Sequence, residues 1–160
     1  MCLCLGPTGS GKTLLLKRLQ NETVDDKSSS IPTVGTNIYH IRSNNVFKEV
    51  REIGGTIAPL WSKYYKPSIK ILYVVDAANL CQISAAGVLL YTILTNPDCR
   101  KSKVMLVLTK MDVSYRQMRN EALLMLHIDR LRKEIKQSIT IVETSTLTGE
   151  GIQQIVDFLK

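Results

Sequence analysis

An eight-residue stretch near the start of the chain has the composition and spacing of a phosphate-binding loop. Residues 6–13 read Gly-Pro-Thr-Gly-Ser-Gly-Lys-Thr and satisfy the pattern GxxxxGK(S/T) in full. Glycines in such a loop let backbone N–H groups approach phosphate oxygens, and the helix that follows adds partial positive charge. The pattern therefore predicts phosphate contacts from Gly6, Thr8, Gly9, Ser10, Gly11 and Leu14.

Two side chains at the end of this loop add more specific chemistry. Lys12 is expected to reach the β- and γ-phosphates of a nucleotide, and the hydroxyl of Thr13 to ligate Mg²⁺. The loop follows an apolar run and opens a helical stretch over residues 14–19, which is the context that the pattern requires. The motif indicates phosphate binding but does not identify the base.

A second motif, Thr109-Lys110-Met111-Asp112, bears on the base. A carboxylate at Asp112 would accept hydrogen bonds from the ring N–H and the amino group of guanine, whereas adenine offers no such pair of donors. Lys110 would lie along the base. Taken alone, this short motif is a weak signal, and the N-cap of a helix would be the favoured interpretation of Asp112. The phosphate-binding loop in the same chain favours the guanine interpretation.

The elements that must position these residues follow from hydrophobic patterning. Short, nearly continuous apolar runs at residues 1–5, 69–75, 104–108 and 139–142 are typical of strands buried on both faces. Helical stretches lie between them at residues 82–94 and 116–136, the second with Leu124, Ile128, Leu131 and Ile135 on one face. Such alternation predicts an open α/β sheet that binds ligands at the carboxyl ends of its strands.

A hairpin interrupts the alternation, with residues 37–42 and 46–53 on either side of a Ser-Asn-Asn turn. It predicts one antiparallel edge strand on a mostly parallel sheet. A last helix is expected from about Gly151 to Lys160. The predicted fold class is therefore α/β, a three-layer α/β/α P-loop NTPase, and 160 residues suit a single domain.

Composition excludes several classes of protein. With 44% hydrophobic and 22% charged residues, the chain is neither disordered nor fibrous. Its four cysteines show no zinc-binding or CxxC spacing, so we expect free thiols. The net charge of +7 is spread along the chain without interleaved aromatic residues, which favours solvated helix faces and predicts no nucleic-acid partner.

Five segments in one order resemble the Ras-like small GTPases and, among them, the ADP-ribosylation-factor-like branch. They are residues 6–13, Pro32-Thr33-Val34-Gly35, Ile53-Gly54-Gly55, residues 109–112 and Thr144-Ser145-Thr146. The 22 positions from Thr33 to Gly55 match the spacing typical of that branch. Pro59-Leu60-Trp61 and Tyr64-Tyr65 also resemble its second switch. The resemblance covers nearly the whole chain.

This resemblance implies a small G-domain that binds GTP or GDP with Mg²⁺ and acts as a molecular switch. Thr33 would ligate the metal through its hydroxyl, and the N–H of Gly55 would contact the γ-phosphate. Ser145 and Thr146 would close over guanine. Effector proteins would bind the GTP form through the first switch segment, from Pro32 to Tyr39, and the second, from Gly54 to Tyr65. The aromatic residues of the second segment could equally pack in the core.

Three positions depart from the family pattern. Glu52 stands where the family has aspartate, so we expect Glu52 to join Thr13 and Thr33 as a metal ligand with altered geometry. Thr56 stands where the family has the glutamine that orients the attacking water, which predicts slow GTP hydrolysis by the catalytic set of Lys12, Thr33, Gly55 and Thr56. Thr109 replaces the usual asparagine of the base motif, and guanine binding should survive that change.

Two other functions stay open from the sequence. A pseudo-GTPase would bind nucleotide without cycling, and a P-loop phosphotransferase would use ATP and a lid, although the chain has no arginine-rich lid segment. Cys2 stands where myristoylation needs glycine, so we expect no lipidation there, and membrane contact stays open. We expect a cytoplasmic monomer that visits endomembranes transiently. The sequence names neither an exchange factor nor an activating protein.

Overall fold

The computed structural model describes residues 1–25, 27–28, 31–67, 69–113 and 116–160. Its centre is a six-stranded sheet with strand order β2-β3-β1-β4-β5-β6. The strands are β1 (Cys2–Leu5), β2 (Thr36–Ser43), β3 (Val46–Ile53), β4 (Lys70–Asp76), β5 (Lys103–Thr109) and β6 (Ile139–Glu143). Adjacent strands are parallel except β2, which pairs antiparallel with β3 at one edge. The predicted fold class is confirmed.

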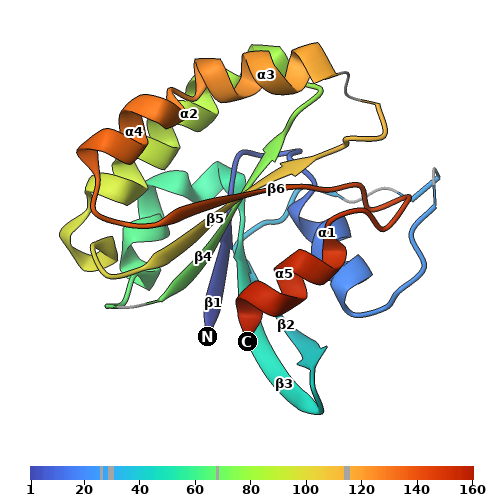
Figure 1. The fold of residues 1–160 in the computed structure, drawn as a ribbon. Helices are drawn as coiled ribbons and strands as arrows, with labels where there is room; N and C mark the ends of the chain where they lie inside the picture. The colour runs from blue at the N-terminus through green and yellow to red at the C-terminus, as the bar shows by residue number, and fades with distance from the viewer. Residues whose placement is uncertain (26, 29–30, 68, 114–115) are drawn as a thin grey trace.

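Helices cover both faces of the sheet. They are α1 (Lys12–Leu19), α2 (Leu80–Thr95), α3 (Arg116–Met125), α4 (Ile128–Glu134) and α5 (Ile152–Leu159), with short 3₁₀ segments η1 (Gly55–Tyr64) and η2 (Pro97–Cys99). Figure 1 shows α1 and α5 on one side of the sheet and α2, α3 and α4 on the other. This is the predicted three-layer arrangement.

The core divides into two clusters because successive strand residues point to opposite faces. In β1, Leu3 and Leu5 join the cluster beneath α2, α3 and α4, whereas Cys2 and Cys4 join the cluster beneath α1 and α5. Both faces of the central strands are therefore buried. This explains why their sequences read as continuous apolar runs.

The β2–β3 hairpin turns through two asparagines. Asn44 and Asn45 have φ of 49° and 61°, which a type I′ turn requires and which asparagine tolerates better than most residues. The turn sets the register, in which Tyr39 faces Val50 and Asn37 faces Glu52. Eight residue pairs run from Thr36↔Ile53 to Ser43↔Val46. The expected hairpin is thus present.

The single helix predicted over residues 116–136 is wrong. His127 adopts a left-handed conformation with φ of 53° and separates α3 from α4. Leu126 and Ile128 are both buried in the core, yet two residues apart on one helix they would point about 200° apart. The break lets both face inward. It leaves Leu124, a member of the predicted apolar stripe, 75% exposed.

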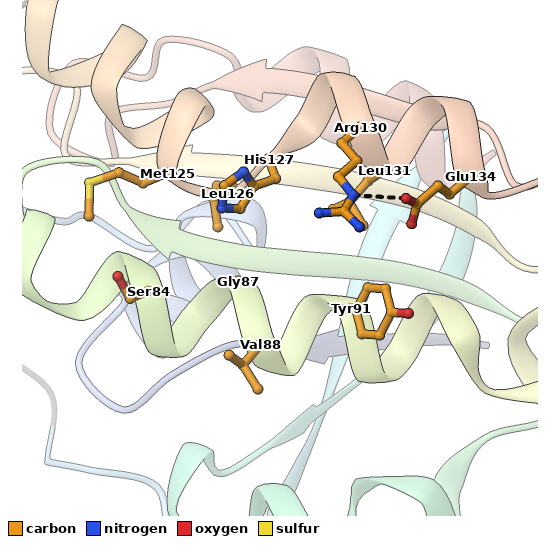
Figure 2. Close-up of a pocket in the computed structure, with 10 residues that line it drawn as sticks. All are labelled: Ser84, Gly87, Val88, Tyr91, Met125, Leu126, His127, Arg130, Leu131 and Glu134. Atoms are coloured by element: carbon orange, nitrogen blue, oxygen red, sulfur yellow. Dashed lines mark hydrogen bonds and ion pairs between the residues drawn. The ribbon is translucent and has the colours of Figure 1, made fainter.

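An open pocket of about 470 Å³ accompanies this break (Figure 2). Ser84, Gly87, Val88 and Tyr91 from α2 line one wall, and residues of α3, α4 and the break between them line the other. On the upper wall, Arg130 donates to Glu134 at 2.8 Å. None of the residues predicted to do chemistry lines this pocket, so the functional site lies elsewhere.

The described helices include none that is both long and apolar enough to cross a lipid bilayer.

Candidate functional site

The phosphate-binding loop joins β1 to α1 at the carboxyl end of the sheet, as predicted. Gly6 has φ of 150°, and a Cβ atom at this position would collide with the carbonyl oxygen of Val74 in β4. Glycine is therefore required for the loop to leave β1 beside its neighbour. Across the loop, the Ser10 N–H donates to the Pro7 carbonyl at 3.3 Å.

Lys12 places a positive charge inside this loop. Its side chain is only 5% exposed, and its Nζ donates to the carbonyl oxygens of Gly6 and Pro7 at 2.9 Å each. Burial lowers the pKa of the Lys12 ammonium. A bound anion would favour the charged form, so the arrangement suits a phosphate group.

The three predicted metal ligands lie together although they come from distant parts of the chain. Thr13 Oγ1 donates to Glu52 Oε1 at 2.6 Å, and Thr33 Oγ1 contacts the same oxygen at 3.0 Å. The two threonine hydroxyls are 3.2 Å apart. They belong to α1, to the loop before β2 and to the end of β3, so the cluster joins the first switch segment to the phosphate-binding loop.

The chemistry of these donors fits Mg²⁺. The cluster offers two hydroxyl oxygens and one carboxylate, and Mg²⁺ takes few protein oxygens when phosphates and water complete its octahedron. Within the part of the chain that the structure describes, no group of three or more His, Cys, Asp or Glu residues could hold a metal by itself. The donor set is therefore suited to a metal bound together with a nucleotide.

Sequence reasoning did not assign a metal-site role to Tyr39. Its hydroxyl donates to Glu52 Oε2 at 3.2 Å. Burial, and then the charge of Glu52, raise the pKa of Tyr39 to about 12, so its O–H stays a donor at neutral pH. The hairpin register could have revealed this contact, because Tyr39 is the diagonal neighbour of Glu52 on the same sheet face.

Gly54 and Gly55 let the second switch segment approach two other loops closely. A Cβ atom at Gly54 would collide with the carbonyl of Thr33, and one at Gly55 would collide with the backbone of Thr8. The Gly54 N–H also donates to the Gly35 carbonyl at 2.9 Å. Thus the first switch segment, the second switch segment and the phosphate-binding loop meet at these glycines.

The structure shows that Trp61 belongs to the core and not to the surface of the second switch segment. Trp61 is 2% exposed, and its indole Nε1 donates to the Gly54 carbonyl at 3.1 Å. Tyr64 and Tyr65 pack partly buried against the same core cluster. Thr56, by contrast, is exposed at the start of η1. Trp61 therefore supports the second switch segment from beneath.

The predicted base-binding residues gather at the ends of β5 and β6. Ser145 Oγ donates to Asp112 Oδ1 at 2.8 Å, and Ser145 is fully buried. Thr109 Oγ1 lies 2.6 Å from the Ser10 carbonyl and 3.1 Å from the Val75 carbonyl. The shorter side chain at Thr109 therefore links β5 to the phosphate-binding loop. Leu14 and Thr146, the remaining predicted contacts, are half-buried near these loops.

Lys110 has a partner that sequence reasoning missed. Its Nζ forms an ion pair with Asp76 Oδ2 at 2.6 Å, at the end of β4. Asp76 is buried, whereas the Lys110 side chain is nearly half exposed. The backbone of Lys110 is in the left-handed region, with φ of 60°. In α2, Gln82 Nε2 donates to the Thr8 carbonyl of the phosphate-binding loop at 2.8 Å.

The family model described as ADP-ribosylation factor family matches residues 1–160. This chain belongs to the ADP-ribosylation factor family. It is 34% identical to human ADP-ribosylation factor-like protein 16 over 167 aligned residues, which cover 100% of this chain and 84% of that protein. It is 32% identical to ADP-ribosylation factor-like protein 1 of Caenorhabditis elegans, with 98% and 85% covered.

Solved structures agree on the fold of this Arf-family chain. The Arl6 BBS3 small GTPase from Trypanosoma brucei, with bound nucleotide analogue GppNp, superimposes with a TM-score of 0.81. The match covers 99% of this chain and 93% of that one at 20% sequence identity. Arf-family proteins are small GTPases that bind guanine nucleotide, and this chain is a small GTPase switch. The predicted family and the predicted small-GTPase switch are confirmed, and the slow rate of hydrolysis stays a prediction.

Proposed function

We propose that this Arf-family protein, as one G-domain over residues 1–160, binds GTP or GDP with Mg²⁺ at the carboxyl edge of its sheet. The cluster of Thr13, Thr33 and Glu52 carries the proposal, because it brings a switch residue to a metal-suited group beside the phosphate-binding loop. Bound Mg²⁺ would neutralise phosphate charge there. Lys12 would contribute the second cation.

The other residues divide by the part of the nucleotide that they face. The phosphate-binding loop offers backbone N–H groups to the phosphates. Asp112 and Ser145 bind and enclose guanine, and the Lys110 stem lies along the base while Asp76 holds its ammonium. The full set of proposed nucleotide contacts is Gly6, Thr8, Gly9, Ser10, Gly11, Lys12, Thr13, Leu14, Thr33, Gly55, Thr109, Lys110, Asp112, Ser145 and Thr146.

The presence or loss of the γ-phosphate would control the first and second switch segments, which contact each other and the metal cluster. Thr33 reaches the metal cluster through its hydroxyl, and Gly54 holds the first switch segment through the Gly35 carbonyl. In the GTP state, Thr33 would bind the metal and the Gly55 N–H would contact the γ-phosphate, which would tighten both segments, and hydrolysis would release them. Val34 is 91% exposed, and Ile38 and Leu60 are also exposed, so the two segments present apolar side chains to effector proteins.

Hydrogen exchange tests this switch. In the presence of Mg²⁺, the GTP analogue GppNp is expected to slow amide exchange in residues 32–39 and 54–65 relative to GDP, because only GppNp supplies the γ-phosphate group. Amides of β5, which are buried within the sheet, serve as the internal control and should exchange alike in both states. Equal exchange of the switch segments with both nucleotides would contradict the proposal.

Slow hydrolysis is the second part of the proposed function. Thr56 lies at the start of η1 and is too short to orient water as glutamine does. Thr56→Gln is therefore expected to raise the single-turnover rate of GTP hydrolysis by about 10- to 100-fold, as restored orientation of a reacting water can. Thr56→Ser should stay slow and serves as the matched control.

The hydrolysis rates also separate the switch from its alternative. If wild-type protein already turns over GTP as fast as Thr56→Gln, the assigned effect of Thr56 is wrong. If neither protein hydrolyses GTP, the pseudo-GTPase interpretation replaces the cycling one.

We further propose that the protein acts as a cytoplasmic monomer with transient contact with endomembranes.

A further inference from the structure

Every oxygen of the Glu52 carboxylate has a hydroxyl partner. Oε1 contacts the hydroxyls of Thr13 and Thr33, and Oε2 accepts a hydrogen bond from Tyr39. Glu52 is 1% exposed, so these hydroxyls replace the water that a surface carboxylate would have. The two oxygens thus have different hydrogen-bond partners: Oε1 contacts the threonines, and Oε2 contacts Tyr39.

The length of the glutamate side chain explains why the hydrogen bond from Tyr39 to Oε2 matters. Glutamate has one more rotatable bond than aspartate, so its carboxylate can occupy more orientations and loses more entropy when it is fixed. The threonines contact Oε1 alone, and rotation about the last bond would exchange the two oxygens. A donor at Oε2 removes that freedom and keeps Oε1 toward Thr13 and Thr33.

Tyr39 lies on a strand whose pairing can fix the position of its hydroxyl group. It lies in β2, which is paired with β3 over eight residue pairs, and Glu52 lies on the strand opposite. The side chain of Tyr39 has two torsions, and its ring spans the diagonal distance between sheet neighbours. A rigid strand pair therefore sets the position of the phenol relative to the carboxylate.

We propose that Tyr39 is a positioning residue that orients the Glu52 carboxylate toward Mg²⁺ in the nucleotide site. This inference rests on the proposed function, because it assumes that Glu52 serves a metal bound with nucleotide. In this role Tyr39 would touch Glu52 and not the metal or the nucleotide. It acts through the oxygen of Glu52 that the threonines do not use.

The test measures how strongly Mg²⁺ slows the release of a fluorescent GDP analogue. Tyr39→Phe removes only the hydroxyl, and it is expected to raise the Mg²⁺ concentration for half-maximal slowing about tenfold, as loss of an outer-shell partner typically does. The release rate without Mg²⁺ should stay unchanged. Tyr91→Phe, which alters a half-exposed tyrosine on α2, is the matched control and should shift neither quantity.

A double-mutant cycle separates positioning from a general structural effect. Glu52→Asp shortens the side chain by one methylene group and withdraws its carboxylate from the phenol. In that background, Tyr39→Phe is expected to change the half-maximal Mg²⁺ concentration less than about twofold, because coupled residues are not additive. Circular dichroism of each variant without metal confirms the folded state.

Three results would overturn the inference. An unchanged Mg²⁺ dependence in Tyr39→Phe would show that the phenol does not orient Glu52. An equal shift in the Glu52→Asp background would show that Tyr39 acts by another route. Failure of the wild-type protein to retain the GDP analogue at any Mg²⁺ concentration would overturn the proposed function and this inference together, whereas the first two results leave the proposed function intact.

Discussion

Lys12→Met is expected to lower the affinity for GTP and GDP on the order of 10²-fold. Lys12 Nζ lies within the phosphate-binding loop against the carbonyl oxygens of Gly6 and Pro7, where no other described lysine or arginine donates. A hydrogen bond to a charged group contributes about 1.5–3 kcal/mol, which corresponds to this loss. Methionine keeps the length and apolar stem of the side chain but has no charge. Isothermal titration with GDP and Mg²⁺ measures the change.

Two comparisons make this result specific to phosphate binding. Lys17→Met alters a half-buried lysine on the same helix and should leave the affinity unchanged. Burial lowers the pKa of Lys12 because the charged ammonium loses its hydration, so removal of the charge should offset part of the stability that is lost with the two hydrogen bonds to Gly6 and Pro7. Thermal unfolding without nucleotide checks this point. Wild-type affinity in Lys12→Met would contradict the assigned role.

Asp112→Ala is expected to abolish most of the preference for GTP over ATP. A site built to pair with the donors of guanine can reject a base without them on the order of 10⁴-fold, because its polar group would stay unpaired. Ser145 already holds one oxygen of Asp112 in place at 2.8 Å. Alanine removes the acceptor, so the two nucleotides should bind with similar, weak affinities. Competition against a fluorescent nucleotide measures the ratio.

The matched control for this prediction is Asp129→Ala, which alters an aspartate in the first turn of α4. It should keep the GTP preference of the wild type. If Asp112→Ala also kept that preference, the guanine-binding role of Asp112 would be wrong, and its bond with Ser145 would serve only to join two loops.

The fold was predictable because local pattern and tertiary structure agree over most of the chain. The apolar runs that form β1, β4 and β5 are buried on both faces, so their sequence pattern agrees with their burial. The run that forms β6 was expected to be buried in the same way, but β6 is an edge strand in which Thr140 is exposed. The break at His127 was not predictable from periodicity. Leu124, Ile128 and Leu131 are spaced as on one helix, and only the packing of Leu126 and Ile128 against one core requires the left-handed residue.

The candidate site was predictable where its members belong to continuous motifs. Lys12, Thr13 and Asp112 could be proposed because their motifs have recognisable spacing, and Ser145 because its segment follows the other motifs in the family's order. Their contacts with a nucleotide stay predictions. The ion pair between Lys110 and Asp76 and the bond between Tyr39 and Glu52 join residues from different strands. The order of the strands determines the contact between Lys110 and Asp76, and the register of the hairpin determines the contact between Tyr39 and Glu52. Neither strand order nor register can be predicted from a local motif.

Trp61 illustrates a third kind of difficulty. Aromatic residues are enriched both in cores and at interfaces, so its residue type favoured neither. The structure decides because the indole N–H has a buried partner in the Gly54 carbonyl. Exposed apolar residues such as Val34 are therefore better candidates for effector contact than the tryptophan.

The measurement that tests the central claim most directly is titration of the wild-type protein with GTP, GDP and ATP in the presence of Mg²⁺. The account predicts tight binding of GTP and GDP and binding of ATP weaker on the order of 10⁴-fold. Equal binding of ATP, or binding of none of the three, would contradict the claim that this edge of the sheet is a guanine-nucleotide site.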